Sequence, residues 1–230
     1  MSSTDALIWI ILTYIGTSIP TAYILMKLYR QVDIQKIGSG NVGTSNVIQH
    51  GGLYLGVFGG AVDCLIKGSL PILLLKNLGY EIEMQAIIAL ASIIGHNWSL
   101  YIKFRGGRGL ATSIGIFIGL SLWIELLILS ILLLVFGKLF SKDTGPWSLI
   151  AFIIIPVISL FLNRDEAICL LMPGILLLII FKRITANWKT APTENDTIYH
   201  ILLNRLVWDR DTHLKENWIS RKSTLQKKAD

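Results

Sequence analysis

Charged residues are scarce in this 230-residue sequence: Asp, Glu, Lys and Arg account for 16% of it, against 53% for hydrophobic residues. So apolar a chain is not an ordinary soluble domain, and its composition also excludes a disordered chain. Cysteine is scarce too, because Cys64 and Cys169 are the only two and both lie in apolar runs. A disulfide scaffold is therefore excluded. The net charge of +6 does not by itself indicate a soluble nucleic-acid binder, so we expect a membrane protein with no nucleic-acid partner.

Six apolar runs predict an all-α fold, a polytopic bundle of membrane helices. A helix needs roughly 20 apolar residues to cross the hydrocarbon core. The run at residues 110–140 exceeds that length, so it is either one long tilted helix or two shorter helices joined by a turn near residues 119–123. The other runs lie at about residues 6–28, 54–75, 84–101, 147–162 and 166–181.

Positive charge in the loops decides between six and seven membrane spans, since short loops rich in Lys and Arg stay in the cytoplasm. With the amino terminus outside, seven spans place the strongly basic loops and the carboxyl-terminal tail together in the cytoplasm. Six spans would place the tail, which has ten Lys or Arg against six Asp or Glu from residue 182 onward, opposite the basic loop at 103–108. We therefore expect about seven transmembrane helices, the fourth of them short, with the carboxyl terminus in the cytoplasm.

The chain changes character near residue 190, which predicts a membrane-integral domain at 1–189 and a polar cytoplasmic tail at 190–230. Within the tail, apolar residues recur at helical spacing. This spacing indicates either an amphipathic helix on the inner leaflet or a helix packed on a loop. The apolar positions are Ile198, Ile201, Leu202, Leu206 and Val207.

The loop after the first span, which we call the first glycine loop, covers residues 38–46 and reads Gly-Ser-Gly-Asn-Val-Gly-Thr-Ser-Asn. Glycines separated by small polar residues can turn several backbone N–H groups toward one anion, and a phosphate is the natural guest. The Gly-x-Gly-x-x-Gly spacing also occurs in dinucleotide-binding folds, but those need a preceding β-strand that this membrane sequence does not offer. A flexible glycine-serine loop is the plainer alternative.

A second glycine loop, residues 103–113, reads Lys-Phe-Arg-Gly-Gly-Arg-Gly-Leu-Ala-Thr-Ser and lies on the same predicted side. It combines three cations, Lys103, Arg105 and Arg108, with glycines that lead into a helix start. Fixed charge and a positive helix end suit an anion with two or more charges. An ordinary positive-inside loop is the alternative, although that rule requires no glycines.

A few ionisable groups lie within or beside the apolar runs, where each is a functional candidate. Asp63 and Lys67 are four residues apart on one helical face, so they form a structural pair or orient the basic loop. Glu125 lies near a predicted helix end, where an interfacial position is the simpler interpretation. His96, and less so His50, is a candidate general base at neutral pH, with a hydrogen-bonding role as the alternative. The sequence has no carboxylate or histidine set at metal-ligand spacing, so we expect neither a metal nor an organic cofactor.

With these motifs in view, residues 14–189 resemble the bacterial membrane family of acyl-phosphate:glycerol-3-phosphate acyltransferases. The resemblance implies transfer of a fatty acyl group from acyl phosphate to the 1-hydroxyl of glycerol 3-phosphate, giving lysophosphatidic acid. It also implies a multi-pass protein of the bacterial plasma membrane whose active site faces the cytoplasm. The matching segments are Ser18-Ile19-Pro20, residues 32–34, the first glycine loop, residues 63–68, and Gly95-His96 leading to the second glycine loop.

Together, the loops and the resemblance predict a site for acyl phosphate and glycerol 3-phosphate at the lipid boundary. We expect Ser39, His96 and Asn187 to be catalytic, with Asn187 and the substrate-binding Ser148 implied by the resemblance. The remaining predicted substrate-binding residues are Gly38, Gly40, Asn41, Gly43, Asn46, Lys103, Arg105, Gly106, Gly107, Arg108, Gly109 and Thr112.

The chain departs from the family pattern in three places. Gln35 and Gln49 stand where the family has basic residues, and the third motif at residues 182–189 lacks the family's His. A neutral amide offers no fixed charge or bidentate fork to a phosphate. An active, divergent enzyme is our leading hypothesis; a non-catalytic protein that binds lipid phosphates and a transporter of anionic solutes are the alternatives.

Overall fold

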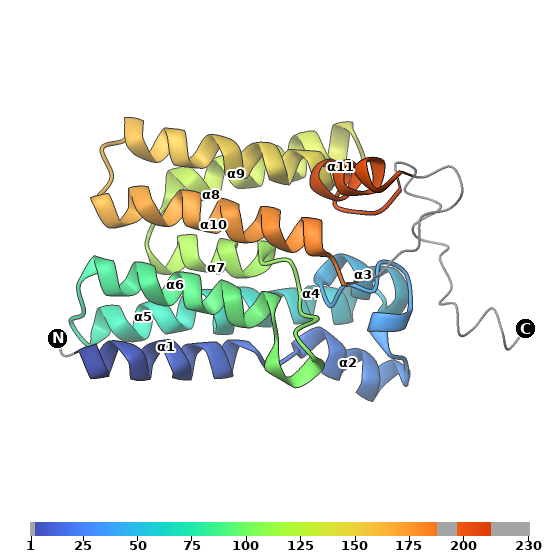
Figure 1. Ribbon diagram of the computed structural model, residues 1–230, viewed down its shortest axis with the longest axis horizontal. Coiled ribbons are helices and arrows are strands. Elements are labelled where there is room, and N and C mark those ends of the chain that lie inside the picture. The colour runs from blue at the N-terminus through green and yellow to red at the C-terminus, as the bar shows by residue number, and fades with distance from the viewer. Residues whose placement is uncertain (1–2, 188–196, 213–230) are drawn as a thin grey trace, which may run out of the picture.

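The computed structural model describes residues 3–187 and 197–212, and in these ranges the chain folds into helices joined by loops. The helices run side by side along the long axis of the molecule (Figure 1). They are α1 (Ser3–Thr17), α2 (Thr21–Arg30), α3 (Thr44–Gly51), α4 (Leu53–Val62), α5 (Leu70–Asn77), α6 (Ile82–Asn97), α7 (Leu110–Gly119), α8 (Trp123–Ile131), α9 (Thr144–Phe161), α10 (Glu166–Thr185) and α11 (Ile198–Trp208). A π-helical segment, Asp63–Ser69, joins α4 to α5, and another, Leu132–Phe140, extends α8.

The all-α membrane fold expected from the sequence is confirmed. In the described part of the chain, five helical stretches are long and apolar enough to cross a membrane. Each apolar run of the sequence is helical, but α6 has 16 residues and α7 has ten, fewer than a full perpendicular crossing needs. The count of about seven spans therefore stays a prediction. The five stretches are Thr4–Arg30, Leu53–Asn77, Trp123–Phe140, Thr144–Phe161 and Glu166–Thr185.

The 110–140 run forms two helices, as the turn near residues 119–123 allowed. α7 ends at Gly119, Ser121 adopts a left-handed conformation with φ of 58°, and α8 begins at Trp123. The first run differs from the expected single helix at 6–28, because it breaks between Thr17 and Thr21. Pro20 lies in this break, and a proline both lacks a backbone N–H and disfavours helical geometry in the residue before it.

Close backbone packing brings the Asp63–Ser69 segment against α7. A side chain at Gly115 would overlap the carbonyl of Cys64, and one at Gly68 would overlap the carbonyl of Thr112. Small residues let membrane helices approach this closely, and the Ser69 hydroxyl then donates to the Gly115 carbonyl at 2.8 Å. This contact fixes Asp63 and Lys67 next to the start of α7.

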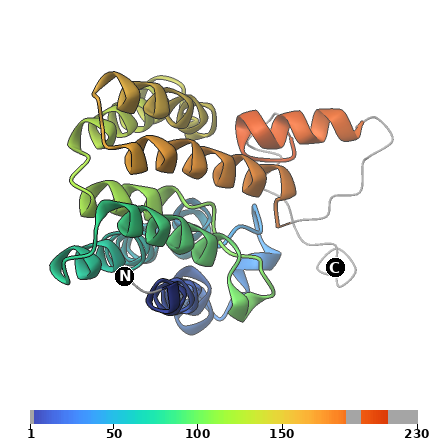
Figure 2. The ribbon, with the colours of Figure 1, turned by 60° about the vertical axis from the view of Figure 1, so that its left-hand side comes forward.

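The predicted helix in the tail exists as α11. It packs against α9 and α10, at the end of the bundle where α3 also lies (Figures 1 and 2). Ile201 is buried there, whereas Ile198 is 62% exposed. α11 packs on two helices rather than on a loop, and the expected position on the inner leaflet stays a prediction. The boundary at residues 189 and 190 and the remaining tail lie outside the described residues, so the division into two domains stays a prediction.

Glu125, which the sequence places near a helix end at the membrane interface, lies in the first turn of α8, and its depth in the membrane stays a prediction. Its side chain is fully buried, and its carboxylate accepts two hydrogen bonds from Arg164, from Nε at 2.8 Å and Nη2 at 2.9 Å. The Ser159 hydroxyl lies 3.4 Å from the same carboxylate. The hydrogen bonds to Glu125 raise the pKa of Arg164, which lies in the loop between α9 and α10. This ion pair joins α8 to that loop at the end of the bundle opposite α11.

Removing Arg164 should destabilise the fold, because it leaves the Glu125 carboxylate buried without a partner. We expect Arg164→Ala to lower the free energy of unfolding by about 3 kcal/mol, measured as a lower Tm in detergent. Arg164→Lys should cost less, and Lys76→Ala, an exposed cation, is the matched control. An unchanged Tm for Arg164→Ala would show that the pair contributes nothing to stability.

Candidate functional site

The first glycine loop is shaped by two left-handed glycines and held by one amide. Gly38 and Gly40 have φ angles of 54° and 64°. The Asn46 Nδ2 donates to the carbonyls of Ile34, Ile37 and Asn41 at 3.1–3.3 Å, and its Oδ1 accepts from the Ser39 N–H at 3.4 Å. Asn46 is buried and fully engaged in these bonds, so it organises the loop from within.

Ser39 lies inside the same loop, with 7% of its surface exposed. Its hydroxyl oxygen accepts a hydrogen bond from the Asn41 N–H at 3.1 Å, which closes a tight turn. A hydroxyl also has one hydrogen to donate, and this bond does not use it. Gly43 precedes α3 as its N-cap residue in an extended conformation.

His50 packs under the first glycine loop, where a side chain at Gly38 would overlap it. Burial lowers the pKa of His50, so its imidazole is neutral at pH 7. The His50 ring thus packs directly against Gly38.

The second glycine loop caps the end of α6. The Gly106 N–H donates to the Asn97 carbonyl at 3.1 Å, and the Gly107 N–H donates to the His96 carbonyl at 3.0 Å. These N–H groups therefore satisfy the last carbonyls of a helix and do not point toward an anion. The sequence predicted Gly106 and Gly107 as substrate-binding residues. Their N–H groups are already used within the fold, so they do not bind a substrate anion.

Arg108 and Gly109 come next, and α7 starts immediately after them. Gly109 is the N-cap residue, with φ of 79°, and offers no side chain to cover the first N–H groups of α7. The positive end of α7 therefore adjoins Arg108. Thr112 is fully buried on α7, and its hydroxyl has no hydrogen-bond partner among the described residues. Lys103 and Arg105 lie on the exposed rim of the loop.

Asn187 joins the two glycine loops. Its Nδ2 lies 2.9 Å from the Gly106 carbonyl, 3.4 Å from the Gly40 carbonyl and 3.5 Å from the Asn41 Oδ1. Its Oδ1 accepts from the Lys182 Nζ at 3.1 Å. The structure therefore brings together three segments that are far apart in the sequence, around residues 40, 106 and 187.

Lys182 is a site residue that the sequence reasoning missed. It is buried, lies 5.3 Å above the Trp98 ring, and its Nζ is 3.5 Å from the Phe104 carbonyl in the second glycine loop. A basic residue in the last turn of a helix is usually explained by the helix dipole or by the positive-inside rule. Its burial, which would have distinguished it, is visible only in the tertiary structure.

Arg183 was missed for the same reason and meets Arg108 at a second cavity. Its Nη2 donates to the Ser148 hydroxyl at 2.6 Å and to the Gly145 carbonyl at 3.1 Å. Its Nε lies 3.6 Å from the Asp209 carboxylate, which also forms an ion pair with Arg108. This cavity is small, and its lining residues are Arg108, Leu110, Ser148, Phe152, Ile179, Arg183 and Asp209.

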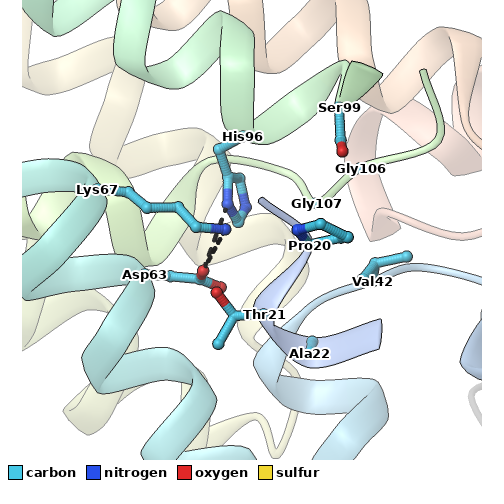
Figure 3. A pocket seen from close by; sticks show the side chains of 10 residues that line it. All are labelled: Pro20, Thr21, Ala22, Val42, Asp63, Lys67, His96, Ser99, Gly106 and Gly107. Carbon is cyan, nitrogen blue, oxygen red and sulfur yellow. Dashed lines mark ion pairs between the residues drawn. The ribbon is translucent and has the colours of Figure 1, made fainter. Parts of the chain in front are cut away.

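A buried triad of ionisable groups lies beside Gly106 and Gly107 of the second glycine loop (Figure 3). The Lys67 Nζ lies 2.7 Å from the Asp63 Oδ1, and the His96 Nδ1 lies 3.8 Å from the same oxygen. All three side chains are at most 5% exposed. They line a small cavity, together with Pro20, Thr21, Ala22, Val42, Ser99, Gly106 and Gly107.

Gly107 is tightly constrained by this triad, because an added Cβ would overlap the His96 ring. We expect Gly107→Ala to lower the free energy of unfolding by about 1–3 kcal/mol, as over-packing does. Gly16→Ala is the matched control, since Gly16 lies in helix α1 with open space where its Cβ would be. Thermal unfolding in detergent measures both, and equal Tm values would contradict the close contact.

Comparison with known proteins gives a consistent result. A family model described as glycerol-3-phosphate acyltransferase matches residues 7–191. Glycerol-3-phosphate acyltransferase 4 of Dehalococcoides mccartyi is 33% identical over 225 residues, which cover 94% of each chain. The crystal structure of PlsY, an integral membrane glycerol 3-phosphate acyltransferase in its glycerol 3-phosphate form, superposes with a TM-score of 0.73. It is 26% identical to this chain and the match covers 98% of this chain and 100% of PlsY.

The same enzyme in its lysophosphatidic acid form superposes with a TM-score of 0.69 at 28% identity, over 78% of this chain and 88% of PlsY. Within the described residues, no group of three or more His, Cys, Asp or Glu side chains is placed to hold a metal ion.

Proposed function

This chain belongs to the glycerol-3-phosphate acyltransferase family, and we propose that its active site is the end of the bundle where Asn187 joins the two glycine loops. The protein is an integral membrane acyltransferase that transfers a fatty acyl group from acyl phosphate to glycerol 3-phosphate, forming lysophosphatidic acid. Its relatives are named as acyltransferases, which favours this activity over lipid-phosphate binding without turnover and over anion transport.

The observation that supports this location is the convergence of buried cations beside both loops. Arg108, which precedes α7, and Arg183, in the last turn of α10, line one cavity. The adjacent Lys182 contacts the second glycine loop. Acyl phosphate and glycerol 3-phosphate both have phosphate groups, which arginine recognises through a bidentate fork. The apolar helices around this end admit the acyl chain from the bilayer.

In this reaction, the 1-hydroxyl of glycerol 3-phosphate attacks the carbonyl carbon of acyl phosphate, and the phosphate group leaves. Acyl phosphate is a mixed anhydride with a good leaving group, so alignment and charge stabilisation supply most of the acceleration. Arg108 and Lys182 stabilise the charge on the departing phosphate. No covalent enzyme intermediate is required.

We assign distinct roles to the three predicted catalytic residues. Ser39 donates its free hydroxyl hydrogen to a phosphate oxygen, and Asn187 holds the two loops in register. His96 is the general base for the attacking hydroxyl in this proposal, because its ring lines the cavity beside Gly106 and Gly107 and Asp63 lies 3.8 Å from its Nδ1. The carboxylate of Asp63 then stabilises the imidazolium.

Arg108→Ala should lower kcat/KM by about two orders of magnitude, since it removes one charge that the departing phosphate needs. Purified protein, acyl phosphate and labelled glycerol 3-phosphate provide the assay, with lysophosphatidic acid as the measured product. Lys138→Ala, an exposed cation on the π-helical end of α8, is the matched control. Absence of product from the natural protein would end the enzyme assignment, and full activity of Arg108→Ala would remove the proposed site.

We also propose that this end of the bundle faces the cytoplasm of a bacterial cell, with the amino terminus outside. The glycine loops, α3 and α11 lie at the end opposite the amino terminus (Figure 1). Most of the loop cations, Lys36, Lys103, Arg105 and Arg108 among them, belong to that end, as the positive-inside rule requires.

Cysteine labelling tests this orientation. In a background with Cys64 and Cys169 replaced by Ala, a membrane-impermeant maleimide should label Ser45→Cys and Lys103→Cys only after permeabilisation. Lys76→Cys, an exposed position in the last turn of α5, should react in intact cells. Reaction of Ser45→Cys and Lys103→Cys from opposite sides would separate the two glycine loops and contradict a shared site.

A further inference from the structure

The segment after α10 delivers a carboxylate to the basic cavity of the proposed active site. Asp209 follows α11 in a left-handed conformation with φ of 59°. Its carboxylate forms an ion pair with Arg108 and lies 3.6 Å from the Arg183 Nε. Arg108 also donates to the Asp209 backbone carbonyl. The only acidic side chain lining this cavity, among the described residues, is therefore one supplied by the tail.

Polar contacts hold α11 over the cavity. Arg183 Nη1 donates to the Leu206 carbonyl at 2.8 Å, in the last turn of α11, where the helix dipole is negative. Arg205 Nη1 donates to the Ile184 carbonyl at 3.0 Å, and Arg210 pairs with Asp143 at 2.6 Å.

Apolar packing and polar contacts both contribute to this attachment. Ile201 is buried and Ile198, Tyr199 and Leu203 are exposed, while the half-buried apolar residues of α11 are Leu202, Leu206, Val207 and Trp208. The contacts that Arg108 and Arg183 make with α11 and Asp209 are the part of the attachment for which another anion competes.

A phosphate dianion and the Asp209 carboxylate seek the same donors. The Arg108 Nη1 donates to both the carboxylate and the backbone carbonyl of Asp209, so a phosphate that binds at this nitrogen has to displace Asp209. A phosphate near pH 7 has a larger negative charge than a carboxylate, so it displaces the carboxylate at sufficient concentration. Asp209 thus resembles the substrate in presenting a negatively charged oxygen to Arg108 and Arg183.

We propose that Asp209 is a built-in competitor that sets the apparent affinity of the enzyme for a phosphate-bearing substrate. The tail occupies the Arg108–Arg183 cavity in the resting enzyme and leaves it when substrate phosphate binds. The binding-competent fraction then scales the apparent dissociation constant, while the rate at saturation is unchanged. This inference rests on the proposed function, because it takes the same cavity as a substrate site. It concerns a residue beyond the stretch matched by the family model, which ends at residue 191.

Kinetics of the full-length Asp209→Asn variant test the proposal. We expect a several-fold lower KM for acyl phosphate or glycerol 3-phosphate with kcat unchanged, because the amide keeps the shape but loses the charge. Asp209→Glu keeps the charge and should retain a KM near that of the natural protein. Asp165→Asn is the matched control, since Asp165 is an exposed carboxylate that caps the other end of α10 and Asn caps a helix equally well.

Hydrogen exchange gives a readout that does not depend on turnover. Inorganic phosphate should speed amide exchange across Ile198–Trp208 in the natural protein, whereas Asp209→Asn should exchange quickly without phosphate. An unchanged or raised KM in Asp209→Asn, or exchange that phosphate does not alter, would overturn the proposal.

The two hypotheses fail in different ways. Full activity of Arg108→Ala would remove the proposed active site and this inference together. If Arg108→Ala loses turnover while Asp209→Asn keeps the natural KM, the active site stands and only the competition by Asp209 is wrong.

Discussion

The hydrogen bonds of the Asn187 amide determine the shape of the site, because they connect parts of the chain that share no local contact. One Nδ2 group serves carbonyl oxygens in both glycine loops, and the Oδ1 accepts from Lys182. An amide suits this position since it both donates and accepts, while the surrounding groups include carbonyls and a cation. Within the described residues, this side chain is hydrogen-bonded to both loops and to Lys182, so it fixes their relative positions.

The glycines of the second loop have a different purpose from the one that their sequence suggests. Gly106 and Gly107 let the loop lie directly on the end of α6, where their N–H groups satisfy the carbonyls of His96 and Asn97. The anion-binding capacity of this region therefore depends on side chains and on the start of α7. Arg108, Lys182 and Arg183 supply fixed charge in surroundings of low dielectric, where each ionic contact is stronger than in water.

The departures from the family pattern have a structural counterpart. Gln35 replaces a basic residue, yet its Nε2 lies 3.3 Å from the Arg105 carbonyl and links the stretch before the first glycine loop to the second. Lys182 and Arg183 begin the degenerate third motif, and both are buried in contact with the site. Asp209 adds a negative charge to them from beyond the stretch that the family model matches.

The sequence by itself determined the membrane-embedded helical class, the split of residues 110–140, the tail helix and the family, because hydrophobic length, helical spacing and glycine motifs are local properties of the chain. It also predicts Asn187 and Arg108 as site residues, which stays a prediction. The tertiary structure alone decided that the first run breaks at Pro20, that Glu125 is buried against Arg164, and that Lys182, Arg183 and Asp209 meet at the site. These outcomes depend on contacts between residues distant in sequence, and neither burial nor ion-pair partners can be read from local composition.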